Sequence, residues 1–150
     1  MNWIMSLPEY VVPLIRDYDH VGIRVSDKAE ALHFYDRLGF ELAAEFPEYS
    51  ACELRSRGGV YLNLVFNAVQ RPGRKNILLD EAVKLPGTTH PCFVVDDLDA
   101  MIRWLQAESI AITEGPTVFE RRRFLFIRDP DGNVLEFMQS ANEGESHAPV

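Results

Sequence analysis

The chain has 150 residues, of which 47% are hydrophobic and 11% aromatic, so it is long and apolar enough to form one ordinary domain with a buried core. This composition excludes a disordered interaction tail. The formal net charge of −8 would on average repel nucleic acid and anionic membranes, and the basic cluster at residues 121–123 is too small to argue for nucleic acid.

The apolar segments and the two cysteines indicate where the protein works. No run reaches the roughly 18 apolar residues of a membrane span, and the N-terminus lacks a basic region followed by a long apolar stretch. Cys52 and Cys92 stand in apolar, strand-like runs, which favours two buried thiols over a disulfide framework or a cysteine metal site. We therefore expect a soluble, cytoplasmic protein that binds no membrane.

An internal repeat organises the chain. A shift of 70 residues places His20 on His90 and Asp27 on Asp97. In both halves the histidine opens an apolar, strand-like run, and the aspartate seven residues later stands where a helix N-cap is expected. Strand, cap and helix thus recur in the same order.

The first half, about residues 18–67, predicts one strand, one helix and three further strands. Apolar residues at helical spacing mark the helix, namely Ala31, Phe34, Tyr35 and Leu38. Gly39 ends that helix as a glycine beyond its C-cap would. The three further strands are expected at residues 40–46, 50–55 and 60–66.

The second half, about residues 89–140, predicts the same series of elements. Its helix is marked by Leu98, Met101, Ile102 and Leu105, and its last three strands are expected at residues 110–119, 122–128 and 134–139. Residues 129–133 combine proline with glycine and predict a tight turn before the last strand.

The remaining segments complete a single α+β domain of 150 residues. Residues 68–88 are charged and contain two prolines and two glycines, which suits a linker between the halves. Residues 1–17 read as an N-terminal extension, and residues 141–150 as a polar, frayed tail. The expected architecture is two β-α-β-β-β modules.

Two histidines and one glutamate are candidate metal ligands. His20 and His90 occupy equivalent positions in the repeat, and Glu136 lies inside the last expected strand. Two imidazoles and a carboxylate bind divalent transition metals and leave coordination positions open. A carboxylate among apolar residues is costly to desolvate without a cation or hydrogen bonds. Structural histidines and a solvent-facing Glu136 remain the alternative, but the combination of all three favours a metal site.

Three motifs resemble the vicinal oxygen chelate superfamily: HVGIRVSD at residues 20–27, FYDRLGF at residues 34–40 and RDPDGNVLEF at residues 128–137. That group includes glyoxalase I, fosfomycin-resistance thiol transferases, methylmalonyl-CoA epimerase, extradiol dioxygenases and bleomycin-binding proteins. The resemblance covers about residues 18–140 and is specific for the superfamily, not for one reaction. It implies a glyoxalase-like open barrel in which two β-α-β-β-β modules surround one divalent metal ion.

The resemblance also implies a ligand set. His20, His90 and Glu136 match three ligand positions, and the fourth falls on Asn63, where glyoxalase I has a glutamate. An amide oxygen is a weaker ligand than a carboxylate and cannot act as a general base at neutral pH, which leaves Glu136 as the candidate catalytic residue for proton transfer. Methylmalonyl-CoA epimerase, with an amide at this position, and the fosfomycin transferases, which use His, His and Glu, resemble the arrangement more closely.

Two further positions resemble substrate-binding residues. Arg24 and Asn67 stand where glyoxalase I holds the carboxylate end of glutathione, and an arginine can bind a carboxylate through two parallel hydrogen bonds. The alternatives are a surface arginine paired with an acid and a structural turn asparagine. The substrate is therefore expected to be a small molecule that carries an anionic group.

The expected function is a metal-dependent lyase or isomerase. One Ni, Zn, Mn, Co or Fe ion would bind vicinal oxygens of the substrate and stabilise an enolate or oxyanion. An Fe(II)-dependent extradiol-type dioxygenase is one alternative, since the same triad supports that chemistry. A non-catalytic protein that binds a drug or metabolite, as the bleomycin-binding relatives do, is another. The superfamily implies a homodimer, which would also cover exposed sheet edges.

Overall fold

The structure, a computed structural model, describes residues 13–140, so the expected tail and most of the expected N-terminal extension lie outside the described residues. The eight strands are β1 (His20–Arg24), β2 (Phe40–Phe46), β3 (Ala51–Ser56), β4 (Tyr61–Val65), β5 (Cys92–Val94), β6 (Ile112–Phe119), β7 (Arg122–Arg128) and β8 (Val134–Ser140). The helices are α1 (Lys28–Arg37) and α2 (Leu98–Ala107), with short 3-10 turns at Pro47–Tyr49 and Pro72–Arg74. The predicted α+β fold of two β-α-β-β-β modules is confirmed.

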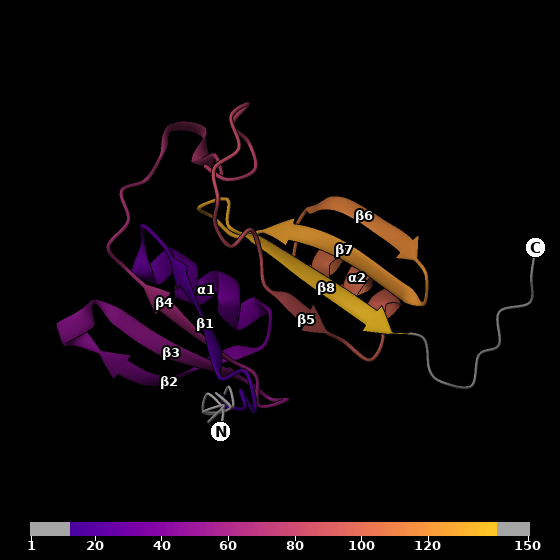
Figure 1. Ribbon diagram of the computed structural model, residues 1–150, viewed down its shortest axis with the longest axis horizontal. Coiled ribbons are helices and arrows are strands. Elements are labelled where there is room, and N and C mark those ends of the chain that lie inside the picture. Colours follow the sequence, from indigo (N-terminus) through magenta and orange to yellow (C-terminus); the bar gives the residue numbers. More distant parts are fainter. Residues whose placement is uncertain (1–12, 141–150) are drawn as a thin grey trace, which may run out of the picture.

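Each module forms one four-stranded mixed sheet. The strand orders are β1-β4-β3-β2 and β5-β8-β7-β6, which are equivalent under the repeat. In both sheets the first strand pairs in parallel with the last, and the other neighbours are antiparallel. Figure 1 shows the two sheets side by side, with α2 behind its own sheet. Strands β1 and β5 are therefore edge strands, as are β2 and β6 at the opposite sides of the sheets.

The helices begin at the predicted caps. The Asp27 carboxylate accepts a hydrogen bond from the amide of Glu30 at 2.8 Å, and the Asp97 carboxylate accepts one from the amide of Ala100 at 2.9 Å. Gly39 follows α1 at a φ of +86°, as a residue beyond a C-cap does. Each helix has ten residues, and none within residues 13–140 is long and apolar enough to cross a membrane.

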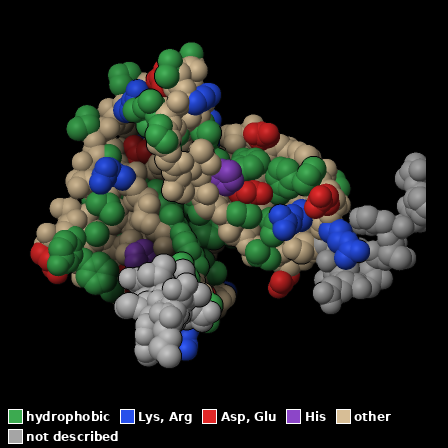
Figure 2. Space-filling view, in the orientation of Figure 1, with side chains coloured by type: hydrophobic (Ala, Val, Ile, Leu, Met, Phe, Trp, Pro, Cys, Tyr) green, Lys and Arg blue, Asp and Glu red, His purple; other side chains and the backbone are tan. Residues whose placement is uncertain are grey.

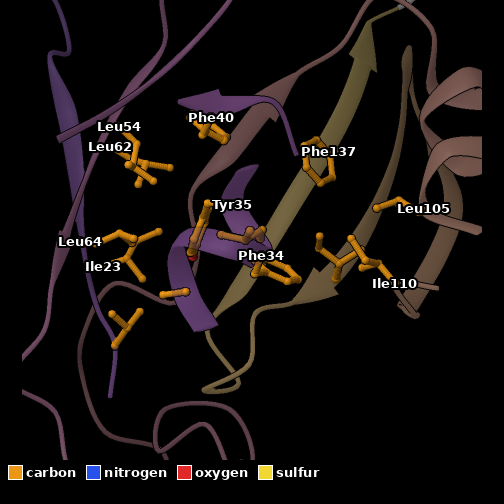
Figure 3. Close-up of a cluster of buried hydrophobic side chains, with 14 of the residues drawn as sticks. Ile23, Phe34, Tyr35, Phe40, Leu54, Leu62, Leu64, Leu105, Ile110 and Phe137 are labelled. Atoms are coloured by element: carbon orange, nitrogen blue, oxygen red, sulfur yellow. The ribbon is translucent and has the colours of Figure 1, made fainter. Parts of the chain in front are cut away.

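The core lies between each sheet and its helix and continues from one module into the other. Ile23, Leu62 and Leu64 are buried with Phe34 and Tyr35 of α1, as Figure 3 shows. Because successive strand residues point to opposite faces, the side chains that alternate with these core residues lie on the helix-free face of the sheet. The candidate ligands of both modules lie on these helix-free faces.

The predicted tight turn at residues 129–133 joins the modules. The Asp129 carboxylate is buried and accepts hydrogen bonds from the Tyr35 hydroxyl at 3.0 Å and from the amides of Asp131 and Asn133, each at 2.9 Å. Burial raises the pKa of Asp129, while these donors oppose that rise. The turn therefore connects β8 to α1 of the other module through a satisfied buried carboxylate.

The linker between the modules is anchored to the same turn. The Arg74 guanidinium donates to the Pro130 carbonyl at 2.7 Å, and the Asn76 side chain donates to the Gly132 carbonyl at 3.1 Å. Arg128 binds both oxygens of Asp80, at 2.5 and 2.7 Å. The predicted linker thus runs over the end of the second sheet in a defined course.

The Asp80–Arg128 pair predicts an acid-sensitive anchor. Hydrogen bonds from Arg128 hold the pKa of Asp80 at about 2, below its ordinary value of 3.8. Because the folded chain binds this proton less readily than the unfolded chain, the pair stabilises the fold above about pH 4 and loses that effect as the pH falls toward 2. In urea unfolding, wild type is expected to exceed Asp80→Asn in stability at pH 6, and the difference to shrink through this range. A pH-independent difference would contradict the prediction.

Candidate metal centre

His90 and Glu136 form a pair on the helix-free face of the second sheet. Their atoms Nε2 and Oε2 lie 3.0 Å apart, and their side chains are 30% and 15% exposed. Glu136 alternates with the buried Leu135 and Phe137 on β8, so its carboxylate points away from α2. The structure therefore brings together two of the predicted ligands and supplies a partner for the half-buried carboxylate.

Both candidate histidines are oriented by the residue that precedes them. The Nδ1 atom of His90 lies 2.9 Å from the hydroxyl of Thr89, and Nδ1 of His20 lies 2.6 Å from a carboxylate oxygen of Asp19. A polar partner at one ring nitrogen sets the tautomer and leaves the other nitrogen for a ligand. Asp19 and Thr89 are equivalent in the repeat, and this signal was present in the sequence but missed.

Asn63 supplies an unsatisfied acceptor on the first sheet. Its Oδ1 atom is buried and has no hydrogen-bond partner among the described residues. Asn63 is the register neighbour of Gly22 on β1, two residues from His20, and both ligand candidates face away from the core. A buried acceptor without a donor costs free energy, and a cation would satisfy it.

The four candidates divide into two pairs, one in each module. Within residues 13–140, no group of three or more His, Cys, Asp and Glu side chains lies close enough to hold one ion. Histidine side chains show on both halves of the face in Figure 2, and an acidic side chain borders the one over the second module. His20 is therefore not grouped with His90 and Glu136 within one chain, and we refer to His20 with Asn63, and to His90 with Glu136, as the two candidate half-sites.

Cys92 lies beside the second half-site, where the sequence had suggested a buried thiol. Cys52 is buried as predicted, but the prediction for Cys92 is wrong, because this residue is exposed on the helix-free face of β5 opposite Glu136. Partial burial, and then the Glu136 charge, raise the pKa of the Cys92 thiol to about 11. The thiol is therefore protonated at neutral pH in this structure.

The two expected substrate-binding residues differ in their surroundings. Arg24 is exposed at the end of β1 and lines a pocket of about 350 Å³, which His90 also lines. Asn67 is exposed beyond β4, and its side chain makes no hydrogen bond with another described residue. The structure thus places Arg24, but not Asn67, at a cavity beside the candidate centre.

Comparison with known proteins identifies the family. The model of the Glyoxalase/Bleomycin resistance protein/Dioxygenase superfamily matches residues 17–137. The chain belongs to this superfamily. The resemblance of the sequence motifs is thereby confirmed, while the match covers proteins of several chemistries and specifies none of them.

One curated protein is similar in sequence, and two solved structures are similar in fold. The protein YaeR of Escherichia coli K12, itself described as uncharacterised, is 28% identical over 133 residues, which are 83% of this chain and 97% of YaeR. A glyoxalase/dioxygenase from Nostoc punctiforme has a TM-score of 0.70 at 21% identity, over 91% of this chain and 100% of that one. TnmS3, an antibiotic binding protein from Streptomyces sp. CB03234, has a TM-score of 0.65 at 27% identity, over 87% and 100%.

Proposed function

We propose that this protein is a metal-dependent enzyme of lyase or isomerase type that acts on a small molecule with adjacent oxygens. His20, Asn63, His90 and Glu136 would hold one divalent ion. The observation that carries the proposal is the pair formed by His90 Nε2 and Glu136 Oε2, 3.0 Å apart on a helix-free face. Two donors that bind one ion at about 2.1 Å and at right angles lie about 3 Å apart.

The chemistry of the donor set also fits a divalent ion. Two imidazoles, one carboxylate and one amide oxygen suit borderline transition metals, and an ion would take the place of the hydrogen bond between His90 Nε2 and Glu136, while Nδ1 is engaged in both rings. Asn63 Oδ1 is the buried acceptor that lacks a partner. When bound, the ion would polarise the oxygens of the substrate as a Lewis acid.

Glu136 would move the proton in this reaction. Its side chain is 15% exposed, so water competes little for the carboxylate, and Asn63 in the matching position of the first module cannot accept a proton at neutral pH. One carboxylate would therefore serve both as a ligand and as the base. Isomerisation through a single base of this kind requires the carboxylate to take a proton and return it to the neighbouring carbon.

We further propose that two copies of the chain share each metal centre. His20 is not grouped with His90 and Glu136 within one chain, and β1 and β5 are edge strands of their sheets. Val94, on the helix-free face of β5, is 69% exposed and would be covered in such a dimer. In a symmetric dimer, His20 and Asn63 of one copy would meet His90 and Glu136 of the other.

Mixed dimers of two inactive variants test both proposals. His20→Ala and Glu136→Ala are each expected to lose the metal, measured by elemental analysis of untagged protein reconstituted with Ni, Zn, Mn, Co or Fe. If sites are shared, a mixed dimer contains one site with both lesions and one intact site, so unfolding and refolding an equal mixture should restore about a quarter of the wild-type metal.

Two outcomes would count against these proposals. Metal retained at wild-type level in both single variants would overturn the metal centre itself. Loss in both variants, followed by no recovery in mixed dimers, would overturn sharing and place the ligands within one chain. Mass spectrometry of the mixture verifies that mixed dimers have formed, and His33→Ala, which alters an exposed histidine of α1, is the control for histidine loss.

Replacing Asn63 is expected to raise the stability of the metal-free protein and to lower its affinity for metal. Asn63→Leu removes the buried acceptor, so metal-free protein is expected to gain about 1 kcal/mol in free energy of unfolding, while metal affinity falls. Urea unfolding in chelator and metal titration followed by calorimetry measure the two effects. A variant that loses stability without metal and keeps its metal affinity would exclude Asn63 as a ligand.

Binding without turnover is the second candidate function, because TnmS3 is an antibiotic binding protein and is 27% identical to this chain. This function would use the same open sheet faces without a metal. Wild-type protein that takes up none of the five ions after reconstitution, yet gives saturable binding of a hydrophobic antibiotic, would favour it. Metal uptake at about one ion per chain would favour the enzyme.

A further inference from the structure

The pocket that Arg24 lines is enclosed on one side by the linker. Its volume of about 350 Å³ is at the lower end of the range for small-molecule sites. Residues of β1 and of the linker line it, together with His90 of the candidate metal centre and Pro91. A molecule held here would therefore lie beside His90.

The pocket is positively charged although the chain is acidic overall. Arg24, Arg71 and Lys75 line it, while the net charge of the whole chain is −8. Neither Arg24 nor Lys75 forms an ion pair with a described side chain, and Arg71 has one long contact of 3.4 Å to an exposed glutamate. The acidic lining residue Asp131 is engaged at both oxygens by the amide and hydroxyl of Ser26. The three cations are thus available to an anion.

The backbone of the linker around Lys75 is held in place by hydrogen bonds. Lys75 lies between Arg74, which donates to Glu30 and to the Pro130 carbonyl at 2.7 Å, and Asn76, whose amide is bound by Asp80 at 2.7 Å. Basic side chains are visible on the linker and on the adjoining edge of the first sheet in Figure 2. Because the backbone is held on both sides of Lys75, a ligand would not have to order it, and binding costs less entropy.

The rest of the lining is mixed, with aliphatic side chains beside polar ones such as Thr88, Thr89 and Asn133. Its aliphatic part comes from Val21 and Ile23 of β1 and from Ile77 and Leu78 of the linker. A pocket with cations and an aliphatic wall suits a molecule with a charged head and a small apolar body. Three cations also match a doubly charged group better than a singly charged one.

We propose that this pocket binds the anionic head of an organic phosphate monoester, through Arg24, Arg71 and Lys75, and that it presents the rest of the molecule to the face that carries His90. A phosphate monoester has a charge of about −1.5 to −2 at neutral pH and accepts several charge-assisted hydrogen bonds. This inference rests on the proposed function for the role of the bound molecule as substrate. The binding itself does not require the metal.

Binding of phenyl phosphate to chelator-treated protein tests the inference. Titration followed by amide chemical shifts should give saturable binding, with shifts in the linker and β1. Lys75→Gln and Arg71→Gln should each weaken binding about fivefold, the effect of losing one partly screened charge contact. Phenylacetate should bind more weakly than phenyl phosphate, and benzyl alcohol should not saturate.

Arg103→Gln on α2 is the matched control, because it removes the same charge from an exposed residue that does not line the pocket. Equal weakening by Arg103→Gln, saturable binding of benzyl alcohol, or shifts confined to other elements would each overturn the inference. Since the titration contains no metal and the mixed-dimer experiment contains no phosphate, the two tests fail independently. Metal uptake with no phenyl phosphate binding would reject this pocket alone.

Discussion

Glu136→Gln is expected to weaken metal binding by more than about 100-fold, because loss of an outer-shell partner alone costs about 10- to 100-fold and Glu136 is proposed as a direct ligand. The amide keeps the size of the side chain and can still accept a hydrogen bond from His90, so the fold should be retained. The carboxylate charge and its ability to take a proton are both lost. Competition titration against a chromophoric chelator measures the affinity.

A glutamate on the same face of the same sheet is the control for this variant. Glu114 on β6 is exposed and is the register neighbour of Phe126, which is in turn the neighbour of Glu136. Glu114→Gln removes one negative charge from this face at a distance of two strands and should leave metal affinity unchanged. Equal losses in both variants would indicate a general charge effect, and an unchanged affinity in Glu136→Gln would remove Glu136 from the ligand set.

Gly132→Ala is expected to be the most destabilising single-methyl substitution in the described part of the chain. Gly132 has a φ of +83°, and a Cβ atom there would lie 2.3 Å from the carbonyl oxygen of Arg74. The positive φ alone costs a non-glycine residue about 1–3 kcal/mol, and the overlap with backbone requires the linker to shift as well. We expect a loss of about 3 kcal/mol or more in free energy of unfolding, measured by urea denaturation.

Gly39→Ala separates the cost of the positive φ from the cost of the overlap with the linker backbone. Gly39 has nearly the same φ, +86°, but a Cβ atom there would meet nothing within 4 Å, so this variant carries only the conformational cost of about 1–2 kcal/mol. The excess loss in Gly132→Ala reports the docking of the linker on the turn. Hydrogen exchange in Gly132→Ala should also accelerate at residues 74–80, and equal losses in the two variants would show that the close approach contributes nothing.

The order of the elements and their faces could be predicted from sequence because local patterns determine them. The 70-residue repeat located both histidines, the caps Asp27 and Asp97 located the helices, and the last apolar run placed Glu136 inside a strand. Helix caps and side-chain periodicity depend on residues a few positions apart in the sequence. Those residues are in contact whenever the helix or strand forms. The fold and the superfamily followed from them.

Contacts between distant segments were decided only by the tertiary structure. Cys92 has an apolar, strand-like surrounding in the sequence, yet it is exposed because β5 is an edge strand whose face has no helix over it. Lys75 and Arg71 read as ordinary linker charges until the linker docks on residues 129–133 and turns them toward Arg24.

For the candidate metal centre too, the sequence named the residues and the tertiary structure decided which of them meet. Sequence reasoning named His20, Asn63, His90 and Glu136 as one set, since repeat and motif treat the two modules alike. Whether equivalent residues meet depends on how two rigid sheets pack, and that is determined by the shared core around Tyr35 and the buried Asp129 rather than by the strands that carry the ligands. Packing over such distances leaves no periodic signal in the sequence, so only the folded chain shows that His20, His90 and Glu136 form no single group among the described residues.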